Sequence, residues 1–145
     1  MGMVYRHTQV SRVTVGALAI AWAAALFSSL RISNPILVVV VVLVGCLLIL
    51  FSTLTVVVRD QVLDVFFGPG LIRRHIPLRR IHEVRVVTTP WHYGWGIRLT
   101  PTGWLWNVSG LGGVELQFDD GHRFRIGSDE PRKLAEVLLR EIRAA

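Results

Sequence analysis

The sequence predicts a membrane-anchored protein of mixed α and β structure: two transmembrane helices form a hairpin, followed by a seven-stranded β-barrel or sandwich that a C-terminal helix caps. Three observations lead to this fold class. Among the first 58 of the 145 residues, the only charges are Arg6, Arg12 and Arg31. Further along, apolar and polar residues alternate as in half-buried strands. The C-terminal residues instead repeat apolar side chains at helical spacing. The predicted parts are an N-terminal segment, residues 1–12, a helical hairpin, residues 13–52, and a β-rich domain, residues 53–145.

The first apolar run covers residues 13–30 and contains no charged side chain. As a helix it would be about 27 Å long, close to the roughly 30 Å hydrocarbon thickness of a bilayer. A cleaved signal peptide is the alternative interpretation, with Arg6 and Arg12 as its basic region. The length of the run, and the second run directly after it, favour a retained helix.

The second apolar run covers residues 35–51. Asn34 suits a helix N-cap, and Pro35 suits the first turn, where a missing N–H costs nothing. The linker of residues 31–34 is long enough only to reverse the chain, so we expect the two helices to be antiparallel neighbours. Cys46, the single cysteine, lies within this run and is expected to be a buried, inert thiol.

The distribution of arginines predicts the orientation in the membrane. Arg6 and Arg12 precede the first helix, and Arg31 alone lies in the linker. Five arginines follow the second helix within thirty residues: Arg59, Arg73, Arg74, Arg79 and Arg80. Because cytoplasmic flanks carry the excess of Lys and Arg, we expect an inner (cytoplasmic) membrane protein with both termini in the cytoplasm.

The β-rich domain is divided by polar or glycine-rich turns at residues 59–61, 68–70, 101–103 and 119–121. Alternation predicts an apolar interior made of Val84, Val86, Ile97, Leu99, Leu116, Phe118, Phe124 and Ile126, and places Trp95 on the same face as Ile97 and Leu99. An interior of this kind argues against an enzyme or small-ligand carrier that uses the inside of a barrel. The final helix is predicted to begin after Ser128 as its N-cap and to bury Leu134, Val137, Leu138 and Ile142.

Residues from about Leu54 to Ile142 resemble bacterial pleckstrin-homology-like domains that follow a two-helix membrane hairpin. The similar stretches are turns and core positions, residues 67–68, 76–78, 81, 94–98, 114–118, 120–121 and 126–131. The resemblance implies a fold and no particular activity. Eukaryotic members hold phosphoinositides with basic residues around the first hairpin loop. The corresponding turn here, residues 59–61, is short and has one arginine, so phosphoinositide binding is not expected.

Two groups of residues are candidates for a partner or lipid surface. Arg73, Arg74, Arg79 and Arg80 lie some fifteen to thirty residues after the second helix, and each could contribute about 1 kcal/mol of attraction to an anionic leaflet. Their alternative role is a solvated face of the domain. Trp91 and Tyr93 lie in an aromatic stretch that suits a membrane interface or a protein contact, with core packing as the alternative.

Other chemistries find no support in the residue pattern. The five histidines share no metal-ligand spacing, and no nucleophile or phosphate-loop motif is present, so we expect no catalytic, cofactor or metal site. The net charge of +6 falls to +3 for the β-rich domain, which has thirteen basic and ten acidic residues. Since these charges are interleaved, nucleic acid is not an expected partner, and no small-molecule substrate is identified.

The function expected from these observations is that of a membrane-tethered, non-enzymatic interaction module at the cytoplasmic leaflet. Its expected partners are membrane lipid and a membrane protein or complex. The alternative is an accessory or assembly subunit of a larger integral membrane complex, held through its transmembrane helices.

Overall fold

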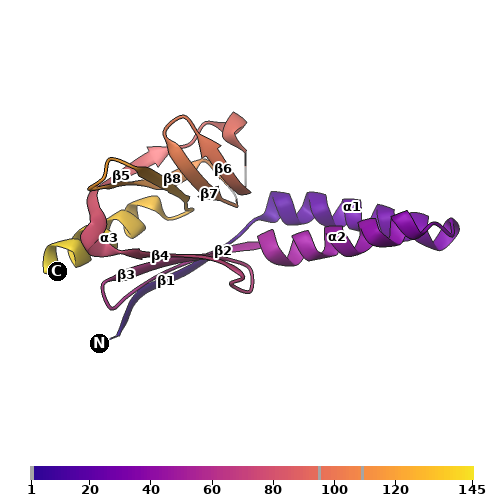
Figure 1. The fold of residues 1–145 in the computed structure, drawn as a ribbon, viewed down its shortest axis with the longest axis horizontal. Helices are drawn as coiled ribbons and strands as arrows, with labels where there is room; N and C mark the ends of the chain where they lie inside the picture. The colour runs from indigo at the N-terminus through magenta and orange to yellow at the C-terminus, as the bar shows by residue number, and fades with distance from the viewer. Residues whose placement is uncertain (1, 95, 109) are drawn as a thin grey trace.

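The computed structural model describes residues 2–94, 96–108 and 110–145. Over these ranges the chain forms three α-helices and nine strands, and the strands make two sheets (Figure 1). The first sheet has the order β1-β2-β3-β4, and the second has the order β5-β8-β9-β7-β6. The predicted fold class, a two-helix membrane hairpin followed by a seven-stranded barrel, is therefore wrong in both the number of strands and their order along the chain.

The first strand comes before the helices. β1 (Met3–Val10) pairs antiparallel with β2 (Thr53–Arg59), from Val10 opposite Thr53 to Met3 opposite Arg59. The helices are thus inserted between two paired strands of the first sheet. The alternation of apolar and polar residues in the sequence did not reveal β1. This strand lies at the edge of the sheet and buries only Tyr5 and Gln9, and its partner strand lies more than forty residues away in the chain.

The two inserted helices, α1 (Arg12–Arg31) and α2 (Pro35–Phe51), run side by side away from the sheets (Figure 1). Asn34 is the N-cap of α2, as predicted, and its side chain accepts a hydrogen bond from the backbone N–H of Ile36 at 2.9 Å. The helices are joined by the Trp22 indole, whose Nε1 donates to the carbonyl oxygen of Val41 at 3.0 Å.

Neither α1 nor α2 contains a buried residue. The Cys46 thiol is exposed, so the prediction of a buried thiol is wrong. By length and composition α1 is a candidate membrane span, whereas α2, with 17 residues, is a shorter apolar helix. A signal sequence or the core helix of a soluble protein passes the same test of composition.

The remaining elements complete the two sheets. They are β3 (Val62–Phe67), β4 (Ile72–Pro77), the 3-10 helix η1 (Leu78–Arg80), β5 (Ile81–Thr88), the 3-10 helix η2 (Trp91–Tyr93), β6 (Gly96–Thr100), β7 (Gly103–Asn107), β8 (Gly112–Phe118), β9 (Arg123–Gly127) and the helix α3 (Pro131–Ala144). The β6–β7 hairpin joins the second sheet through a parallel pairing of β7 with β9, which no sequence pattern indicated.

The core lies between the two sheets. Phe67 of β3 is fully buried, and its ring centroid is 5.3 Å from those of Phe51 and Trp106. Of the predicted interior, Leu116, Phe118, Phe124 and Ile126 are buried, and Val84 and Ile97 pack against the core. Val86 is 48% exposed and Leu99 is 70% exposed, so these two predictions are wrong; they lie on β5 and β6, the edge strands of the second sheet. Trp95 lies outside the described residues.

The C-terminal helix α3 packs against β5, β8 and η1. It buries Leu134 and Leu138 as predicted, with Val137 and Ile142 partly buried beside them. Its N-cap is Glu130 and not Ser128, whose hydroxyl instead accepts a hydrogen bond from the Glu130 backbone N–H at 3.1 Å.

The turn between β3 and β4 lies directly against the end of α2, and Gly68 is the contact. Gly68 has a φ of +49°, and a Cβ there would lie 2.8 Å from the Leu50 carbonyl oxygen and still closer to that of Ile49. We expect Gly68→Ala to lower the free energy of unfolding by about 1–3 kcal/mol more than Gly121→Ala does. Gly121 is a matched control because its φ is also positive, at +82°, but its added Cβ would meet open space. Thermal unfolding in detergent measures both, and equal losses would contradict this packing.

The phenol of Tyr5 lies in the core beside the start of α3. Burial first, and then the charges of Glu130 and Asp129, raise the pKa of Tyr5 to about 12. The unfolded chain ionises a tyrosine near pH 10, so between about pH 10 and 12 the unfolded state holds fewer protons than the folded state. The free energy of unfolding should therefore fall as the pH rises through this range. Urea titrations at several pH values should show a shallower fall for Tyr5→Phe, and an unchanged pH dependence would disprove this assignment.

Candidate functional site

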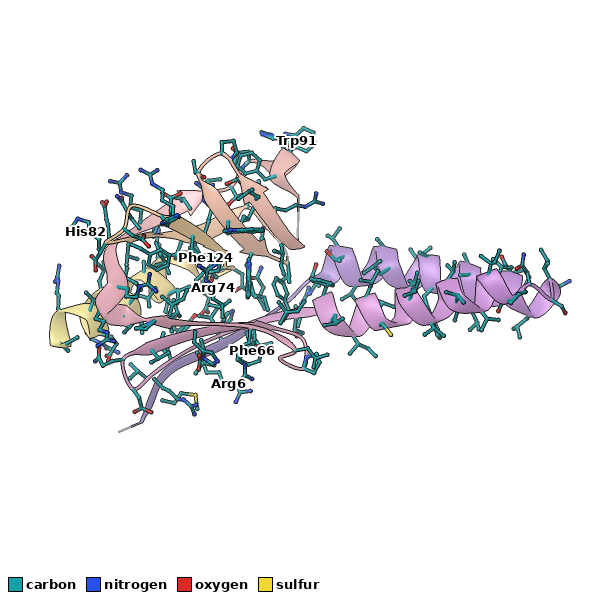
Figure 2. The ribbon with its side chains drawn as sticks, viewed as in Figure 1. Arg6, Phe66, Arg74, His82, Trp91 and Phe124 are labelled. Atoms are coloured by element: carbon teal, nitrogen blue, oxygen red, sulfur yellow. The ribbon has the colours of Figure 1, made fainter. Side chains whose placement is uncertain are left out.

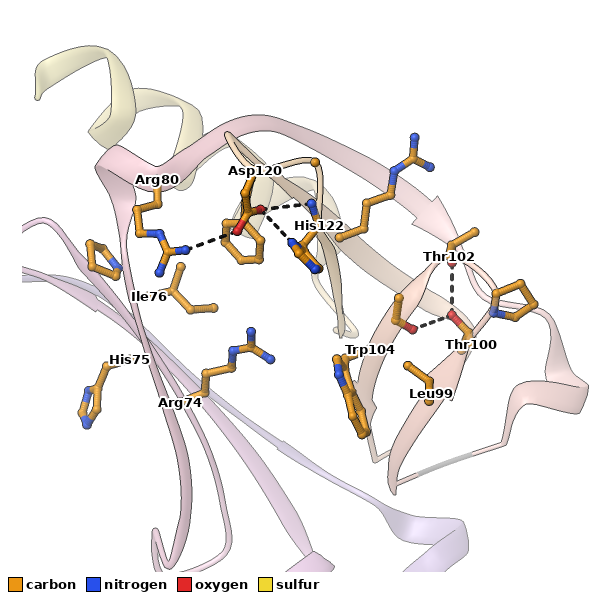
Figure 3. Close-up of a pocket in the computed structure, with 16 residues that line it drawn as sticks. Arg74, His75, Ile76, Arg80, Leu99, Thr100, Thr102, Trp104, Asp120 and His122 are labelled. Atoms are coloured by element: carbon orange, nitrogen blue, oxygen red, sulfur yellow. Dashed lines mark hydrogen bonds and ion pairs between the residues drawn. The ribbon is translucent and has the colours of Figure 1, made fainter.

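A cleft of about 810 Å³ opens between the edge of the first sheet and the turns of the second (Figure 3). One wall is formed by β4 and η1. The other is formed by the β6–β7 hairpin and the turn between β8 and β9. Its polar and charged lining residues are Arg74, His75, Arg80, Thr100, Thr102, Asp120, His122 and Arg123.

Arg74 lies in the wall formed by β4 and η1 because successive side chains of β4 point to opposite faces of the strand. Ile72 and Ile76 pack toward the core, and Arg74, two residues from each, lies on the same face of the strand. Its guanidinium carbon is 4.5 Å from the centroid of the Phe124 ring (Figure 2). Burial above all, and then the charge of Arg80, lower the pKa of Arg74. In the described part of the chain no carboxylate lies within ion-pair distance of it, so a partly desolvated positive charge faces the cleft.

Arg80 belongs to a small polar network at the mouth of the cleft (Figure 3). Its guanidinium is 3.4 Å from Asp120 Oδ2, and Asp120 Oδ1 accepts a hydrogen bond from the His122 backbone N–H at 3.0 Å. That backbone bond first, with the His122 side chain and Arg80, lowers the pKa of the Asp120 carboxyl. Asp120 is the one carboxylate among the described residues that line the cleft. Among these described lining residues it is therefore the group that would compete with an incoming anion for Arg80.

On the opposite wall, the part formed by the β6–β7 hairpin carries neutral groups. Thr100 and Thr102 share a hydrogen bond of 3.1 Å between their hydroxyls, and Thr100 also donates to the Gly103 carbonyl oxygen at 2.7 Å. Leu99 and Trp104 lie beside them with 70% and 45% of their surface exposed. A ligand in the cleft would thus meet the guanidinium groups of β4 and η1 on one side and, along the β6–β7 hairpin, an apolar surface with hydroxyls. This combination suits a chain segment that carries both acidic and apolar side chains.

The structure separates the four arginines that the sequence grouped together. Arg74 and Arg80 line the cleft, but Arg73, on the other face of β4, lies 4.8 Å from the centroid of the Phe66 ring and lines a different hollow with Arg6. Arg79 lines a third hollow beside Glu141. The separation follows from the two-residue period of β4 and from the turn of η1, which buries Leu78.

The two aromatic candidates lie away from the cleft. Trp91 and Tyr93 are in η2, between β5 and β6, at the end of the domain near the helices (Figures 1 and 2). The Trp91 side chain is 79% exposed, so it is not a core residue. Tyr93 is half-buried, with its neighbour His92 packed edge-on at 4.8 Å between ring centroids.

Sequence reasoning missed Asp120, His122 and Arg123, which reach the cleft from a turn forty residues away from Arg74 and Arg80. Asp120 was predicted only as part of the turn at residues 119–121, and neither His122 nor Arg123 was a candidate for a binding surface. The available signal was the pattern of Ile72, Arg74 and Ile76, which places an arginine on the apolar face of a strand. It identifies Arg74 as unusual but says nothing about the residues that face it.

Several other ionisable groups make local pairs. Glu115 is buried and is paired with Arg125 at 2.8 Å, and with Arg123 at 3.6 Å. His75 hydrogen-bonds Asp64 on the neighbouring strand β3. Within residues 2–94, 96–108 and 110–145, no group of three or more His, Cys, Asp or Glu side chains is placed to hold a metal ion.

Comparison with known proteins gives no match for this chain among protein-family models, curated proteins or solved structures. The resemblance to bacterial pleckstrin-homology-like domains therefore stays a prediction from the sequence.

Proposed function

We propose that this chain is a non-enzymatic interaction module that α1 and α2 tether to a membrane, and that its inter-sheet cleft binds an acidic segment of a partner protein. The observation that carries the proposal is that no residue of either apolar helix is buried, although the attached domain has a closed core. Two such helices in water would expose many large apolar side chains, including Ile20, Leu30 and Ile49.

The surroundings of α1 favour membrane attachment over the two other interpretations of its composition. The core helix of a soluble protein would be mostly buried, whereas the apolar window of α1 is 0% buried. A cleaved signal sequence would take β1 with it, and β1 pairs along its length with β2. With 20 residues α1 is about 30 Å long, which matches the hydrocarbon thickness of a bilayer.

The proposed location is the inner membrane with both termini in the cytoplasm. The pairing of β1 with β2 supports one part of this, because it keeps both ends of the helix pair on the same side. Arg6 and Arg12 lie at that end, and Arg31 alone lies at the far tip. The bias toward the domain side favours a cytoplasmic domain.

The cleft supplies the proposed binding surface. Arg74 is positioned by its contact with Phe124, and Arg80 is held at the mouth by Asp120. A guanidinium that is already partly desolvated loses less hydration when a carboxylate binds it than one that is free in water. The apolar side chains Leu99 and Trp104 would then cover the neighbouring part of the bound segment.

The test compares two matched pairs of substitutions. In the protein reconstituted in nanodiscs, Arg74→Gln with Arg80→Gln should weaken binding of a fluorescent glutamate-rich peptide by about tenfold or more, since charge-assisted hydrogen bonds contribute roughly 1.5–3 kcal/mol. Arg73→Gln with Arg79→Gln removes the same charge from neighbouring positions outside the cleft and should change the affinity much less. Fluorescence anisotropy measures both. Equal losses would mean that overall charge, and not the cleft, binds the peptide.

Substitution of Asp120 should have the opposite effect on the affinity for the peptide. Asp120→Asn keeps an acceptor for the His122 N–H but removes the charge that faces Arg80, so the peptide should bind more tightly. The gain should reach at most about fivefold, because an exposed ion pair is worth up to about 1 kcal/mol. Asp119→Asn is the control, since Asp119 lies 3.9 Å from His82 and does not line the cleft. If both variants gain equally, or neither does, Asp120 does not compete for the bound segment.

An accessory subunit of a larger membrane complex is the second candidate function. The observation that favours it is the small outer face of α1, where Gly16, Ala17 and Ala24 are exposed and a Cβ on Gly16 would meet nothing within 4 Å. Small residues let helices approach closely in lipid. A partner that stays bound to the cleft variants in mild detergent, but is released by Ala17→Leu with Ala24→Leu, would support this role instead.

A further inference from the structure

Three loops of the sheets lie at the end of the domain from which α1 and α2 emerge, beside the β9–α3 connection. The β3–β4 turn meets α2, since a Cβ on Gly68 would lie 2.8 Å from the Leu50 carbonyl oxygen. The β7–β8 loop meets α1, where the Thr14 hydroxyl donates to the Val108 carbonyl oxygen at 3.4 Å. The β5–β6 connection, which holds η2, lies at the same end (Figure 1). Strand order dictates this arrangement, because alternate turns of antiparallel strands fall at the same end.

Each of these three loops carries a large apolar side chain that faces solvent. Leu71 in the β3–β4 turn is 80% exposed, Trp91 in η2 is 79% exposed, and Leu111 in the β7–β8 loop is 44% exposed. Figure 2 shows Trp91 on the side of the domain that faces the helices. The connections at the opposite end are residues 60–61, 78–80, 101–102 and 119–121, and Leu78, the large apolar residue among them, is buried. The exposed apolar loop tips are thus gathered at one end.

The charges at this end are mainly positive. Arg12 is the first residue of α1. The Arg73 guanidinium lies beside the β3–β4 turn, 2.8 Å from the place of a Cβ on Gly70, and that of Arg98 lies 3.6 Å from the same place on Gly94. Two acidic residues, Asp129 and Glu130, also lie toward this end in the β9–α3 connection, within 2.5 and 3.5 Å of the His7 ring nitrogens.

The domain is joined to the helices without a flexible linker. Ser11 alone separates β1 from α1, and Ser52 alone separates α2 from β2. The Ser11 N–H donates to the Ser52 carbonyl oxygen at 3.0 Å, which closes the ladder at the base of the helices. Loops that touch the first turn of α1 and the last turn of α2 must therefore lie at the level where those helices leave the hydrocarbon.

We infer that this end of the domain is a second membrane-binding surface, in which Leu71, Trp91 and Leu111 enter the headgroup region of the bilayer while Arg12, Arg73 and Arg98 face the phosphates of anionic phospholipids. The inference rests on the proposed attachment of α1 and α2. An indole suits this depth because it has a large apolar ring and a polar N–H. The surface would hold the domain upright, with the polar turns 101–102 and 119–121 at the mouth of the cleft directed away from the lipid.

The test uses fluorophores attached to cysteines. Because Cys46 is the single native cysteine, replacing it lets each engineered cysteine be labelled alone. In a Cys46→Ser background, Leu71→Cys, Trp91→Cys and Leu111→Cys are each labelled with an environment-sensitive fluorophore and reconstituted in nanodiscs that contain anionic phosphatidylglycerol. Leu99→Cys is a control because Leu99, in the cleft, is 70% exposed, within the 44–80% range of the three loop sites, and Thr102→Cys marks the opposite end. We expect a blue-shifted emission, and quenching by lipids that are spin-labelled near the headgroup, at the three loop sites and at neither control.

A label on Cys46 in the otherwise unchanged chain separates the inference from the proposed function. Cys46 is exposed on α2, so lipid spin labels should quench it if the helix is in the bilayer. Quenching at Cys46 without quenching at the three loops would overturn the inference and leave the tether intact. Quenching at Leu99 and Thr102 as strongly as at the loops would overturn it too, because the domain would then lie flat on the membrane. An unquenched Cys46 would overturn the tether and the inference together.

Discussion

The pairing of β1 with β2 constrains every other part of this molecule. Two strands separated by the whole of α1 and α2 pair in continuous register from Val10 opposite Thr53 to Tyr5 opposite Val58. The bond from the Ser11 N–H to the Ser52 carbonyl oxygen extends the ladder to the first turn of the helices. A helix pair attached through two paired strands cannot pivot as it could on a flexible linker. Closing the long loop between β1 and β2 costs conformational entropy. Contacts between the two helices, among them the hydrogen bond from Trp22 to Val41, partly offset this cost.

From this constraint the domain acquires two distinct ends. The helix end has apolar loop tips at Leu71, Trp91 and Leu111, and the far end has short polar turns. Because successive antiparallel strands run in opposite directions, the position of a loop along the chain decides at which end of the domain it lies. The residues of the loop do not decide this. The proposed membrane contact and the proposed binding cleft are thereby kept apart, and an acidic segment would approach Arg74 and Arg80 from the aqueous side.

The cleft shows how far strand alternation can guide a sequence-based prediction. The four arginines around β4 are close in sequence, and their grouping suggested one basic surface. Neighbouring residues of a strand face opposite sides, so Arg73 lies over Phe66 on the outer face while Arg74 lies over Phe124 on the inner one. That division was readable from Ile72 and Ile76. The contribution of Asp120 and His122 was not, because the turn that carries them reaches the cleft only through the order of strands in the second sheet.

By itself the sequence determined the local elements: the two apolar helices with Asn34 as a cap, most strands of the domain, and the amphipathic helix that buries Leu134 and Leu138. These follow from hydrophobic periodicity and from capping groups, which act over a few residues. Only the tertiary structure decided that residues 3–10 form a strand, that β7 runs parallel to β9, and that Leu99 and Val86 lie on exposed edges. Those features depend on hydrogen bonds between strands distant in sequence, and the residues of an edge strand need not alternate cleanly because one of its sides has no neighbour to bury it.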